Sequence, residues 1–463
     1  MRKLLNNSRL IITLMLLAVL GCNKVSQEFF SDYVSSVTLV PTGNALRYTV
    51  RLEKIKDCSS RVCYRQVGET EWKTADSTMI FLLPDTDYEY MVRLGGDLTS
   101  DIQTFKTGSI PVEVPVYTVD LDEGGPTKGY LMQWQATNPG WLTFCDMSGQ
   151  VVWYEQFDQA VRHVYFDPAS GKIALLTGFR EGVGSKKFQR LCDKIIEIDL
   201  YGNRLLEWIA SEENVPYPHH DIKIMPDGNL LFFNAVVKRF DLSPIGGAPD
   251  TEVWGDGFTI VSPSGEVLRQ WDLFGALDPV KDDYLDAVEL SYDLVHGNSV
   301  AWDSEGDFYI TLNRLNELWK IDGKALEVLY RVGKHGNISL SGDYPEGGLH
   351  SAVPLSPDRV LCYNNGAGEN PRSRAQIYRI DPSARTAVFD LDVAVAPEYS
   401  SADRSNVELL PDGNTLMFAS TLARKCVFTD LEGHPLKVIS RTGIAYRSHY
   451  FDLVYSQLSD FGW

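Results

Sequence analysis

Two kinds of turn signal alternate along most of this chain, and their spacing constrains the fold more than any other feature. The first kind is Pro-Asp-Gly, as at 226–228 and 411–413, or a close variant of it. The second reads Asp/Ser-x-x-Gly ahead of alternating apolar residues, as at 146–149 and 262–265. Each pair of turns delimits four short strands, and the pairs recur at roughly 40–60 residues, the spacing of propeller blades with insertions. The pattern therefore predicts an all-β chain built as a β-propeller.

Counting the turn pairs predicts the number of blades. Five complete pairs lie near 161–209, 219–274, 296–333, 350–391 and 404–439. One further unit near 128–156 lacks an inner strand, and the C-terminal run 449–455 can supply it. Such closure would remove the exposed edges of an open sheet. We predict a six-bladed β-propeller over residues 113–463, with counts of five or seven as open alternatives.

The segment before the repeats predicts a separate small domain over residues 22–112. It reads as short strands between turns, and the run 82–92, which contains Tyr88 and Tyr90, has a tyrosine placed to hydrogen-bond back across a corner. This resembles the tyrosine corner of fibronectin type III domains. Trp72 is the expected core residue, and 104–108 fits the last strand of such an immunoglobulin-like β-sandwich. We interpret this domain as a spacer rather than a catalytic unit.

The N-terminus has the features of a bacterial export signal. Basic residues precede the apolar run 10–20, which is too short to span a bilayer. The run ends in Leu-Gly-Cys, which resembles a lipoprotein signal with Cys22 as the lipidated residue. We expect residues 1–21 to be removed and acyl chains on Cys22 to anchor the mature protein. The predicted location is a bacterial membrane, facing the periplasm or the cell surface.

Charge and cysteine usage exclude several classes of function. The formal net charge is −19, so binding to nucleic acid or to an anionic membrane face is not expected. An anionic substrate would need a local basic pocket. The cysteines after Cys22 lack zinc-ligand spacing, and none adjoins a histidine as a thiol nucleophile would. Cys58 and Cys63 are close enough to close a small disulfide loop after export.

A short motif recurs where the inner strands of the blades should start. Its copies are His219-His220-Asp221, His296-Gly297-Asn298, His350-Ser351-Ala352, Arg404-Ser405-Asn406 and Arg447-Ser448-His449. Inner strands line the central channel of a propeller, so these starts should converge at one mouth. Five of the eight histidines fall in these copies. We therefore predict a cluster of imidazole and guanidinium groups that suits an anion.

The alignment of turns adds two candidate site residues, and the motif residues bear on whether the site holds a metal. The position eight residues after the turn glycine gives Arg314 and Thr421, and the same alignment favours His219 over His220. Imidazoles from several strands can also ligate zinc or iron. The motif supplies Asn298 in place of a carboxylate, and a guanidinium group beside a metal ion is electrostatically unfavourable. We predict no metal and no other cofactor.

These residues match a known pattern. His-His-Asp, then His-x-Asn-Ser with an arginine eighteen residues after that His, then a further His before a Pro-Asp turn, resemble the bacterial arylsulfate sulfotransferases. The resemblance implies a six-bladed propeller behind a small β-sandwich. It also implies nucleotide-independent transfer of a sulfuryl group from an aryl sulfate donor to a phenolic acceptor. The close cysteine pair associated with that family's propeller is not found in this chain.

The resemblance also implies roles for individual residues. His350 matches the family's nucleophile, which forms a transient sulfohistidine in a ping-pong mechanism. We expect Arg314 and Asn298 to bind the sulfuryl oxygens. His296, with His219 or His220, would stabilise the leaving phenolate and deprotonate the acceptor. The remaining expected substrate contacts are Thr421, Arg404 and His449.

Other classes stay open at this point. A sulfate-ester hydrolase would use the same donor with water as the acceptor. The cysteine signature of formylglycine sulfatases and the strand–phosphate-loop–helix pattern of nucleotide-sulfate enzymes are both missing. An exported propeller that binds sugars or proteins, or a polysaccharide lyase, could use the same His/Arg cluster. Homodimerisation through a propeller flank or the first domain is also left open.

Overall fold

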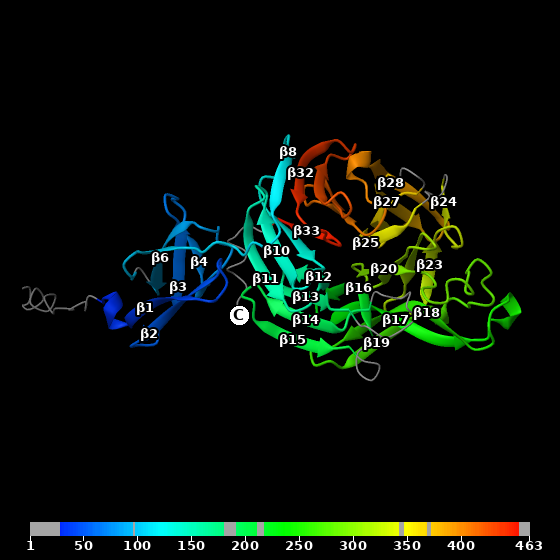
Figure 1. Ribbon diagram of the computed structural model, residues 1–463, viewed down its shortest axis with the longest axis horizontal. Coiled ribbons are helices and arrows are strands. Elements are labelled where there is room, and N and C mark those ends of the chain that lie inside the picture. Colours follow the sequence, from blue (N-terminus) through cyan, green and yellow to red (C-terminus); the bar gives the residue numbers. More distant parts are fainter. Residues whose placement is uncertain are drawn as a thin grey trace, which may run out of the picture.

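The computed structural model describes residues 28–95, 98–179, 191–210, 217–341, 347–367 and 372–452 (Figure 1). These residues form strands and a few single-turn 3₁₀ helices, so the described chain is all-β, as predicted. Within these ranges, no helix is long and apolar enough to cross a membrane. The predicted signal segment 1–21 and its lipidation site Cys22 lie outside the described residues.

The first unit contains two antiparallel sheets. One sheet has the order β1 (Val34–Pro41), β2 (Tyr48–Lys54) and β5 (Thr78–Met79). The other has the order β4 (Lys73–Ala75), β3 (Ser60–Gln66), β6 (Asp87–Leu94) and β7 (Gln103–Lys106). Side chains alternate along β6, with Tyr88, Tyr90, Val92 and Leu94 buried and their neighbours more exposed, which is the pattern of a strand with one face on a core.

The structure agrees with the tyrosine corner expected in the first unit but not with the expected core tryptophan. The Leu83 amide donates a hydrogen bond to the Tyr88 hydroxyl over 2.9 Å, so this tyrosine does reach back to the corner before its strand. Trp72 is only half-buried, and the Arg65 guanidinium lies 4.3 Å from its ring centroid. The prediction of Trp72 as a core residue is wrong, because Trp72 precedes the edge strand β4 and packs under a surface arginine instead.

The second unit contains six sheets among the described residues, and their strand pairs are antiparallel except that β24 pairs parallel with β28. In the order from first to last strand they are β33 (Ser448–Phe451), β9 (Tyr130–Gln135), β10 (Gly140–Asp146), β11 (Val151–Phe157); β12 (Val161–Asp167), β13 (Lys172–Thr177), β14 (Lys194–Asp199), β15 (Arg204–Ile209); β16 (Pro218–Ile224), β17 (Leu230–Phe240), β18 (Thr251–Val261), β19 (Val267–Asp272); β20 (Gly297–Trp302), β21 (Phe308–Leu312), β22 (Glu317–Ile321), β23 (Val328–Val332); β25 (Leu349–Ser356), β26 (Arg359–Asn364), β27 (Arg374–Asp381), β28 (Thr386–Ala394), β24 (Ser339–Leu340); and β29 (Asn406–Leu409), β30 (Leu416–Ser420), β31 (Lys425–Thr429), β32 (Pro435–Arg441), β8 (Tyr117–Asp122).

Both ends of the second unit are tied into sheets formed by distant parts of the chain. β33 pairs antiparallel with β9, with Ser448 opposite Gln133 and Phe451 opposite Tyr130. The C-terminal run therefore supplies the first strand of the incomplete unit, as predicted for its described part. β8 adds a fifth strand to the last sheet by pairing with β32, which the turn pattern did not indicate.

Turn chemistry explains why the Asp-x-x-Gly signals delimit strands. Asp146 Oδ1 accepts hydrogen bonds from the amides of Ser148 and Gln150, each at 2.9 Å, and Gly149 has a φ of +84°. The turn at Asp199 repeats this arrangement, with Gly202 at a φ of +80°. A carboxylate that caps the turn and a glycine in the left-handed region together reverse the chain within a few residues.

The first strands of the six sheets lie side by side in succession. β12 contacts β16, β16 contacts β20, β20 contacts β25, β25 contacts β29, and β29 contacts β33, whose partner β9 contacts β12. Figure 1 shows the sheets radiating from these strands, which is a β-propeller-like arrangement. The first strands therefore bring six distant segments to one axis, and their ends become the natural places for a site.

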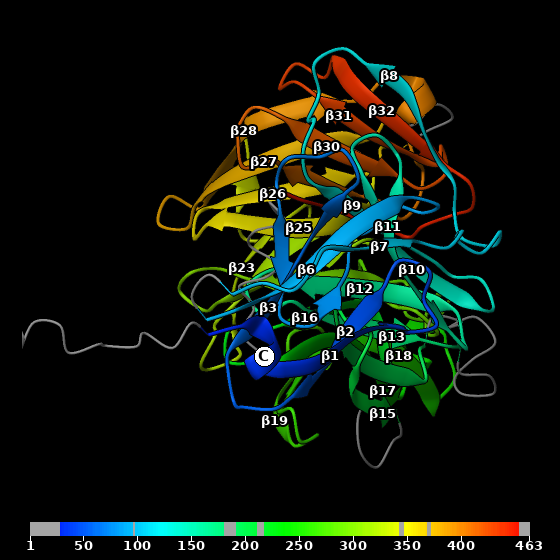
Figure 2. The ribbon, with the colours of Figure 1, turned by 90° about the vertical axis from the view of Figure 1, so that its left-hand side faces the viewer.

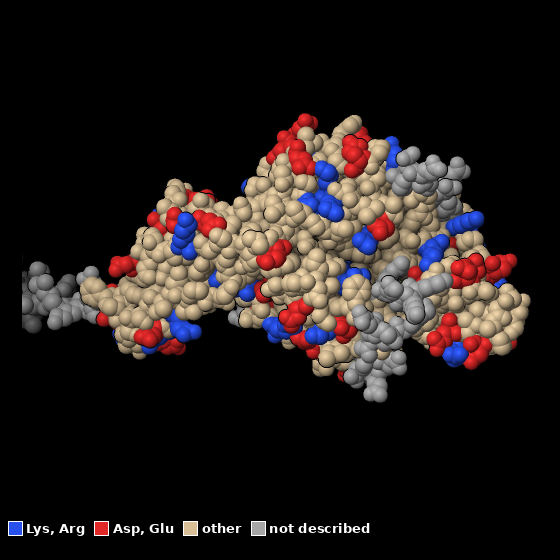
Figure 3. Space-filling view, viewed as in Figure 1, with Lys and Arg blue, Asp and Glu red and all other residues tan. Residues whose placement is uncertain are grey.

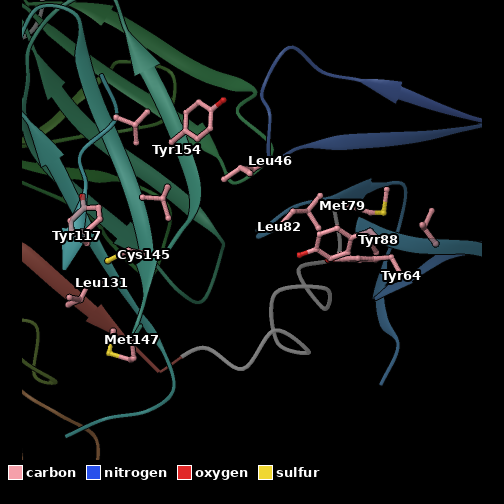
Figure 4. Close-up of a cluster of buried hydrophobic side chains, with 14 of the residues drawn as sticks. Leu46, Tyr64, Met79, Leu82, Tyr88, Tyr117, Leu131, Cys145, Met147 and Tyr154 are labelled. Atoms are coloured by element: carbon pink, nitrogen blue, oxygen red, sulfur yellow. The ribbon is translucent and has the colours of Figure 1, made fainter. Parts of the chain in front are cut away.

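The first unit packs against β10 and β11 of the second unit (Figures 1 and 2). Arg47 forms a 2.7 Å ion pair with Glu155, and the Asn44 side chain donates to the Tyr154 carbonyl over 2.8 Å. Figure 4 shows Leu46 beside Tyr154 in a hydrophobic cluster that draws residues from both units. The contact therefore combines an ion pair, a hydrogen bond and apolar packing.

Cysteines and surface charge add two observations. None of the six described cysteines forms a disulfide, so the small loop that the spacing of Cys58 and Cys63 allows is not closed in the structure. Acidic and basic side chains are interspersed over the face shown in Figure 3. On that face the negative net charge is not gathered into one patch.

Candidate active site

A cavity of about 350 Å³ lies at the starts of the six first strands. We call this the histidine cavity. It is lined by Arg162, His163, His220, His296, Asn313, Gly348, His350, Asn365, Gly366, Ala402, Asp403, Arg404 and Tyr446. Four imidazoles and two guanidinium groups therefore meet in an acidic protein. The predicted convergence of the motif copies is found for His220, His296, His350 and Arg404.

Irregular backbone aims these side chains into the cavity. The pairing register shifts at the start of β12, β16, β20 and β25, each time next to the motif position. His220, His296 and Arg404 have positive φ values of 55–57°, a region that non-glycine residues rarely adopt. Bulges and left-handed residues cost free energy and are held only where the surrounding structure over-determines them. They mark the strand starts as a functional region.

His220 rather than His219 faces the cavity, which reverses the preference from the turn alignment. His219 is fully buried behind the wall, with Nε2 3.3 Å from Asp256 Oδ1. The Nδ1 atoms of His219 and His220 are hydrogen-bonded to each other at 2.7 Å. The bulge at the start of β16 explains the reversal, because an inserted residue exchanges the faces of the strand.

His296 and Arg314 share a carboxylate that the sequence analysis missed. Asp293 is almost fully buried, and its Oδ2 lies 2.7 Å from His296 Nδ1 and 3.2 Å from Arg314 Nη2. Arg314 is not part of the cavity wall, but Asp293 ties it to the wall residue His296. An aspartate three residues before a motif histidine was the available signal.

His350 is held from three directions. Its Nδ1 contacts the side-chain oxygen of Asn365 and lies 3.2 Å from Asn313 Nδ2. Its Nε2 accepts a hydrogen bond from the Arg404 backbone amide over 3.1 Å. The two asparagines were not predicted as site residues, because each lies at the end of a second strand in its sheet rather than in a motif copy.

Asn298 and Thr421 lie behind the cavity rather than on its wall. Asn298 is fully buried, its Nδ2 donates to the Leu349 carbonyl over 3.3 Å, and its Oδ1 has no partner among the described residues. The Thr421 hydroxyl donates to the Tyr446 carbonyl over 3.0 Å and also contacts Ser405. In this structure both residues support neighbouring strand starts.

His449 lies in a different cavity from the other histidines. This apolar cavity, of about 430 Å³, is lined at the opposite ends of the first strands by residues that include Phe166, Trp302, Val353, Leu409, His449 and Phe451. His449 Nδ1 is 2.5 Å from Glu408 Oε1, and its ring stacks on Trp134. The placement of His449 with the cluster is therefore corrected.

Arg447 separates the two cavities and explains the position of His449. Its Nη2 donates to the carbonyls of Asn298 and His350 over 2.7 and 2.8 Å, and its Nη1 lies 3.2 Å from Asp221 Oδ1. Arg447 is itself buried. Two residues along an extended strand advance the chain by roughly 7 Å, so His449 emerges beyond this barrier.

His163 is a fourth cavity imidazole that no motif copy indicated. It is almost fully buried on β12, and its ring meets the Tyr446 ring edge-on at a centroid distance of 4.6 Å. Burial lowers the pKa of His163 well below its usual value, and the charges of Arg162 and Arg447 lower it further. His163 is therefore neutral near pH 7.

Two groups of acidic residues with ligand-like geometry lie elsewhere in the described ranges. One is Asp303, Glu305 and Asp307, and the other is Asp430, Glu432 and His434. Lys320 already occupies the first group, with Nζ 2.8 Å from Asp303 Oδ2. The second group is exposed on a turn, where acidic clusters are common without a metal.

The comparisons with known proteins concern the part of the chain that holds this site. The family described as Arylsulfotransferase (ASST) matches residues 120–440. The chain belongs to this arylsulfotransferase family. Membership confirms the resemblance in the motif residues and supports an arylsulfotransferase activity in general terms. No curated protein matches the chain.

Solved structures show only distant likeness. A protein of unknown function from Bacteroides caccae is 13% identical, with a TM-score of 0.43, over 70% of this chain and 100% of that chain. A putative 6-phosphogluconolactonase from Bacteroides uniformis is 10% identical, with a TM-score of 0.39, over 70% and 100%. The WD40 β-propeller domain of Doa1 is 11% identical, with a TM-score of 0.38, over 72% and 88%.

Proposed function

We propose that this protein transfers a sulfuryl group from an aryl sulfate to a phenol through a covalent intermediate on His350, without a nucleotide donor. The observation that carries the proposal is the histidine cavity, whose lining residues other than Tyr446 lie in the matched family region, with His350 fixed by partners on both ring nitrogens. The same proposal includes the fold: a six-bladed β-propeller, with β33 and β9 completing the first blade, behind a fibronectin III-like sandwich.

The first half-reaction replaces one bond to sulfur by another. The His350 lone pair forms an N–S bond while the S–O bond to the aryl oxygen breaks, and the aryl oxide leaves. Sulfuryl transfer resembles phosphoryl transfer in being loose, so positioning and charge stabilisation do most of the catalysis. Arg404 on the cavity wall and Arg314 beside it supply positive charge near the sulfuryl oxygens.

Proton transfer to the leaving group is assigned to His296. The buried carboxylate of Asp293 can hold His296 as the imidazolium, which gives its proton to the aryl oxide. In the second half-reaction the acceptor phenol returns a proton to His296. Its oxygen then attacks sulfur, and the N–S electron pair goes back to His350. Atoms and protons balance over the two halves.

The acceptor side of the cavity is assigned to His163 and Tyr446. His163 is neutral, and its Nδ1 has no partner among the described residues, so it can hydrogen-bond an acceptor hydroxyl. In a ping-pong scheme, His163→Asn should slow the phenol-dependent step while sparing the initial release of donor phenol. Stopped-flow and steady-state rates with p-nitrophenyl sulfate separate these steps. Equal slowing of both steps would contradict the acceptor assignment.

The deciding experiment uses p-nitrophenyl sulfate with and without added phenol. Strong dependence of nitrophenolate release on phenol, with phenyl sulfate as the product, is the expected result. Release that is independent of phenol would indicate a hydrolase. No release would favour a binding protein or a lyase instead.

We also propose that the mature protein is exported and lipid-anchored. The signal-like run 10–20 and the following Cys22 support this. Metabolic labelling with a palmitate analogue tests it, and a Cys22→Ala chain should lose both the label and membrane association. Labelling that persists in this variant would contradict the assignment.

A further inference from the structure

We infer that Asn365 is a positioning residue that fixes the tautomer of His350 and so decides which ring nitrogen reacts. Asn365 lies directly after β26 and is buried, and its side chain stands between His350 and the segment that leads into β29. The inference rests on the proposed function, because it concerns the nucleophile of that reaction.

The orientation of the Asn365 amide is set by two backbone carbonyls. Its Nδ2 donates to the Ser401 carbonyl over 2.8 Å and to the Arg404 carbonyl over 3.2 Å. Rotating the amide by half a turn would place its oxygen against two other oxygens in a buried site, which costs free energy for every unmade hydrogen bond. The side-chain oxygen must therefore face His350.

An oxygen facing Nδ1 requires a proton on that nitrogen. Asn365 Oδ1 can only accept, so His350 donates from Nδ1. A neutral imidazole carries one N–H, and the lone pair is then on Nε2. An independent contact agrees, since Nε2 accepts a hydrogen bond from the Arg404 amide over 3.1 Å. Both partners select the same tautomer, and the reactive lone pair is on Nε2.

Asn313 competes with Asn365 for His350 Nδ1, and it shows which tautomer Asn365 prevents. Asn313 Nδ2 lies 3.2 Å from His350 Nδ1, and as a donor it would favour the opposite tautomer. Asn313 Nδ2 already donates to the Leu349 carbonyl over 3.2 Å, so it does not need His350 as a partner. Without Asn365, Asn313 could donate to Nδ1, and the proton would move to Nε2, where it blocks attack.

The backbone of Arg404 links the two residues. Its amide binds His350 Nε2 and its carbonyl binds Asn365 Nδ2, which its left-handed conformation at a φ of +55° allows. When the N–S bond forms, the ring becomes cationic and its Nδ1–H still donates to Asn365. The donor must displace the Arg404 amide from Nε2, so this amide becomes available to a sulfuryl oxygen.

The test measures the tautomer directly and does not need turnover. In the full-length protein labelled with ¹⁵N-histidine, the His350 signals are identified by their loss in His350→Ala. We expect a protonated Nδ1 and an unprotonated Nε2 in the wild type. Asn365→Leu should shift the population toward protonated Nε2 and slow the initial nitrophenolate release about 10- to 100-fold, the loss typical of removing an orienting partner.

Two further variants make the test specific. Asn414→Leu makes the same change on an exposed turn and should alter neither measurement. Asn365→Asp keeps an acceptor at Nδ1 and adds a negative charge, so the wild-type tautomer should return and the acidic limb of the pH–rate profile should move to higher pH. The other charged or titratable groups that line the cavity with His350 or contact it are Arg162, His163, His220, His296, Asp403, Arg404, Tyr446 and Arg447.

Either of two results would overturn the inference. One is a wild-type His350 protonated on Nε2, and the other is an Asn365→Leu protein that keeps both the wild-type tautomer and its release rate. A protein with the expected tautomers that never releases nitrophenolate would refute the proposed function and leave the orienting role of Asn365 standing. The two failures are therefore distinguishable.

Discussion

The two ends of the same six strands form cavities of opposite character. At the strand starts, register shifts and left-handed residues bring His163, His220, His296 and His350 together. At the other ends, the pairing of β12, β16 and β20 is regular, β25 has a second register shift between Pro354 and Ser356, and the cavity is mainly apolar. Regular strand pairing thus produces apolar packing. The polar site residues lie where the strand pairing is irregular.

Arg447 is the boundary between these two environments. Its guanidinium group donates to the carbonyls of Asn298 and His350, which belong to two motif copies. It also pairs with the buried Asp221 of a third copy. Arg447 directly precedes β33. The C-terminal segment that completes a sheet therefore also supplies the residue between the two cavities. If this comparison holds, substitutions on the two sides of Arg447 should have unequal effects.

The largest expected effect is at the nucleophile. His350→Ala should abolish sulfuryl transfer from p-nitrophenyl sulfate, because it removes the proposed nucleophile. His449→Ala, on the apolar side, is the matched control and should keep most of the activity. Turnover by the first variant, or loss in the second, would move the active site away from the histidine cavity.

The next effect concerns the boundary itself. Arg447→Met should lower the free energy of unfolding by about 3–5 kcal/mol, because it removes one partner of a buried ion pair and two buried hydrogen bonds. Chemical denaturation measures this loss. Arg379→Met removes a pair in which the arginine is exposed, with Asp390, and should cost far less, because solvent screens such pairs. Equal losses in the two variants would show that Arg447 is not a structural boundary.

A third prediction concerns the charge beside the cavity. Arg314→Ala should lower kcat by about 10²- to 10³-fold, the range for one group that stabilises charge in the transition state. The Arg314 guanidinium also neutralises Asp293, so its loss affects His296 as well. Arg374→Ala, at a surface ion pair with Asp392, is the control. A change of less than about tenfold in the Arg314 variant would exclude this role.

The smallest expected effect is the pH dependence of stability at His163. Burial, and then Arg162, lowers the pKa of His163 in the folded protein, whereas the unfolded chain binds the proton near pH 6.5. Stability is therefore full above about pH 6.5 and falls as the pH drops, because the unfolded state takes up more protons. His163→Asn should flatten this fall, measured as the denaturation midpoint between pH 5 and 7.5.

His434 provides a control of opposite sign. Its hydrogen bond to Asp430 raises the pKa of His434, so its contribution is present at low pH and is lost as the pH rises. His434→Asn should therefore not flatten the acid-side fall. If both variants behave alike, the pH dependence has another origin than His163.

Local signals in the sequence predicted the parts of the fold that local chemistry decides. Asp146 and Gly149 form the turn that their spacing indicates, and Tyr88 makes the corner hydrogen bond. These interactions span only a few residues, so the residue types suffice. The motif histidines could be expected to meet because strand starts share one end of the channel, and His220, His296 and His350 do so.

The errors share one cause, which is dependence on contacts between distant segments. Trp72 is half-buried beside Arg65, His219 lies behind the cavity wall, and His449 lies in the other cavity. Each outcome depends on an edge strand, a bulge or a buried ion pair that turn spacing does not show. Asp293 and Asn365 were missed because neither lies in a copy of the motif at the starts of the first strands.

The sequence by itself determined the all-β class, the recurrence of four-strand units, the incomplete unit that β33 completes and the family of the chain. Only the tertiary structure decided that the Arg404 amide reaches His350 Nε2 and that Arg447 reaches the carbonyls of Asn298 and His350. The physical reason is the separation along the chain between the groups that interact. Turns and strands arise from neighbours along the chain, whereas protonation and burial depend on groups that folding brings together from 50 to 150 residues away, such as His350 with Arg404 and Asn298 with Arg447.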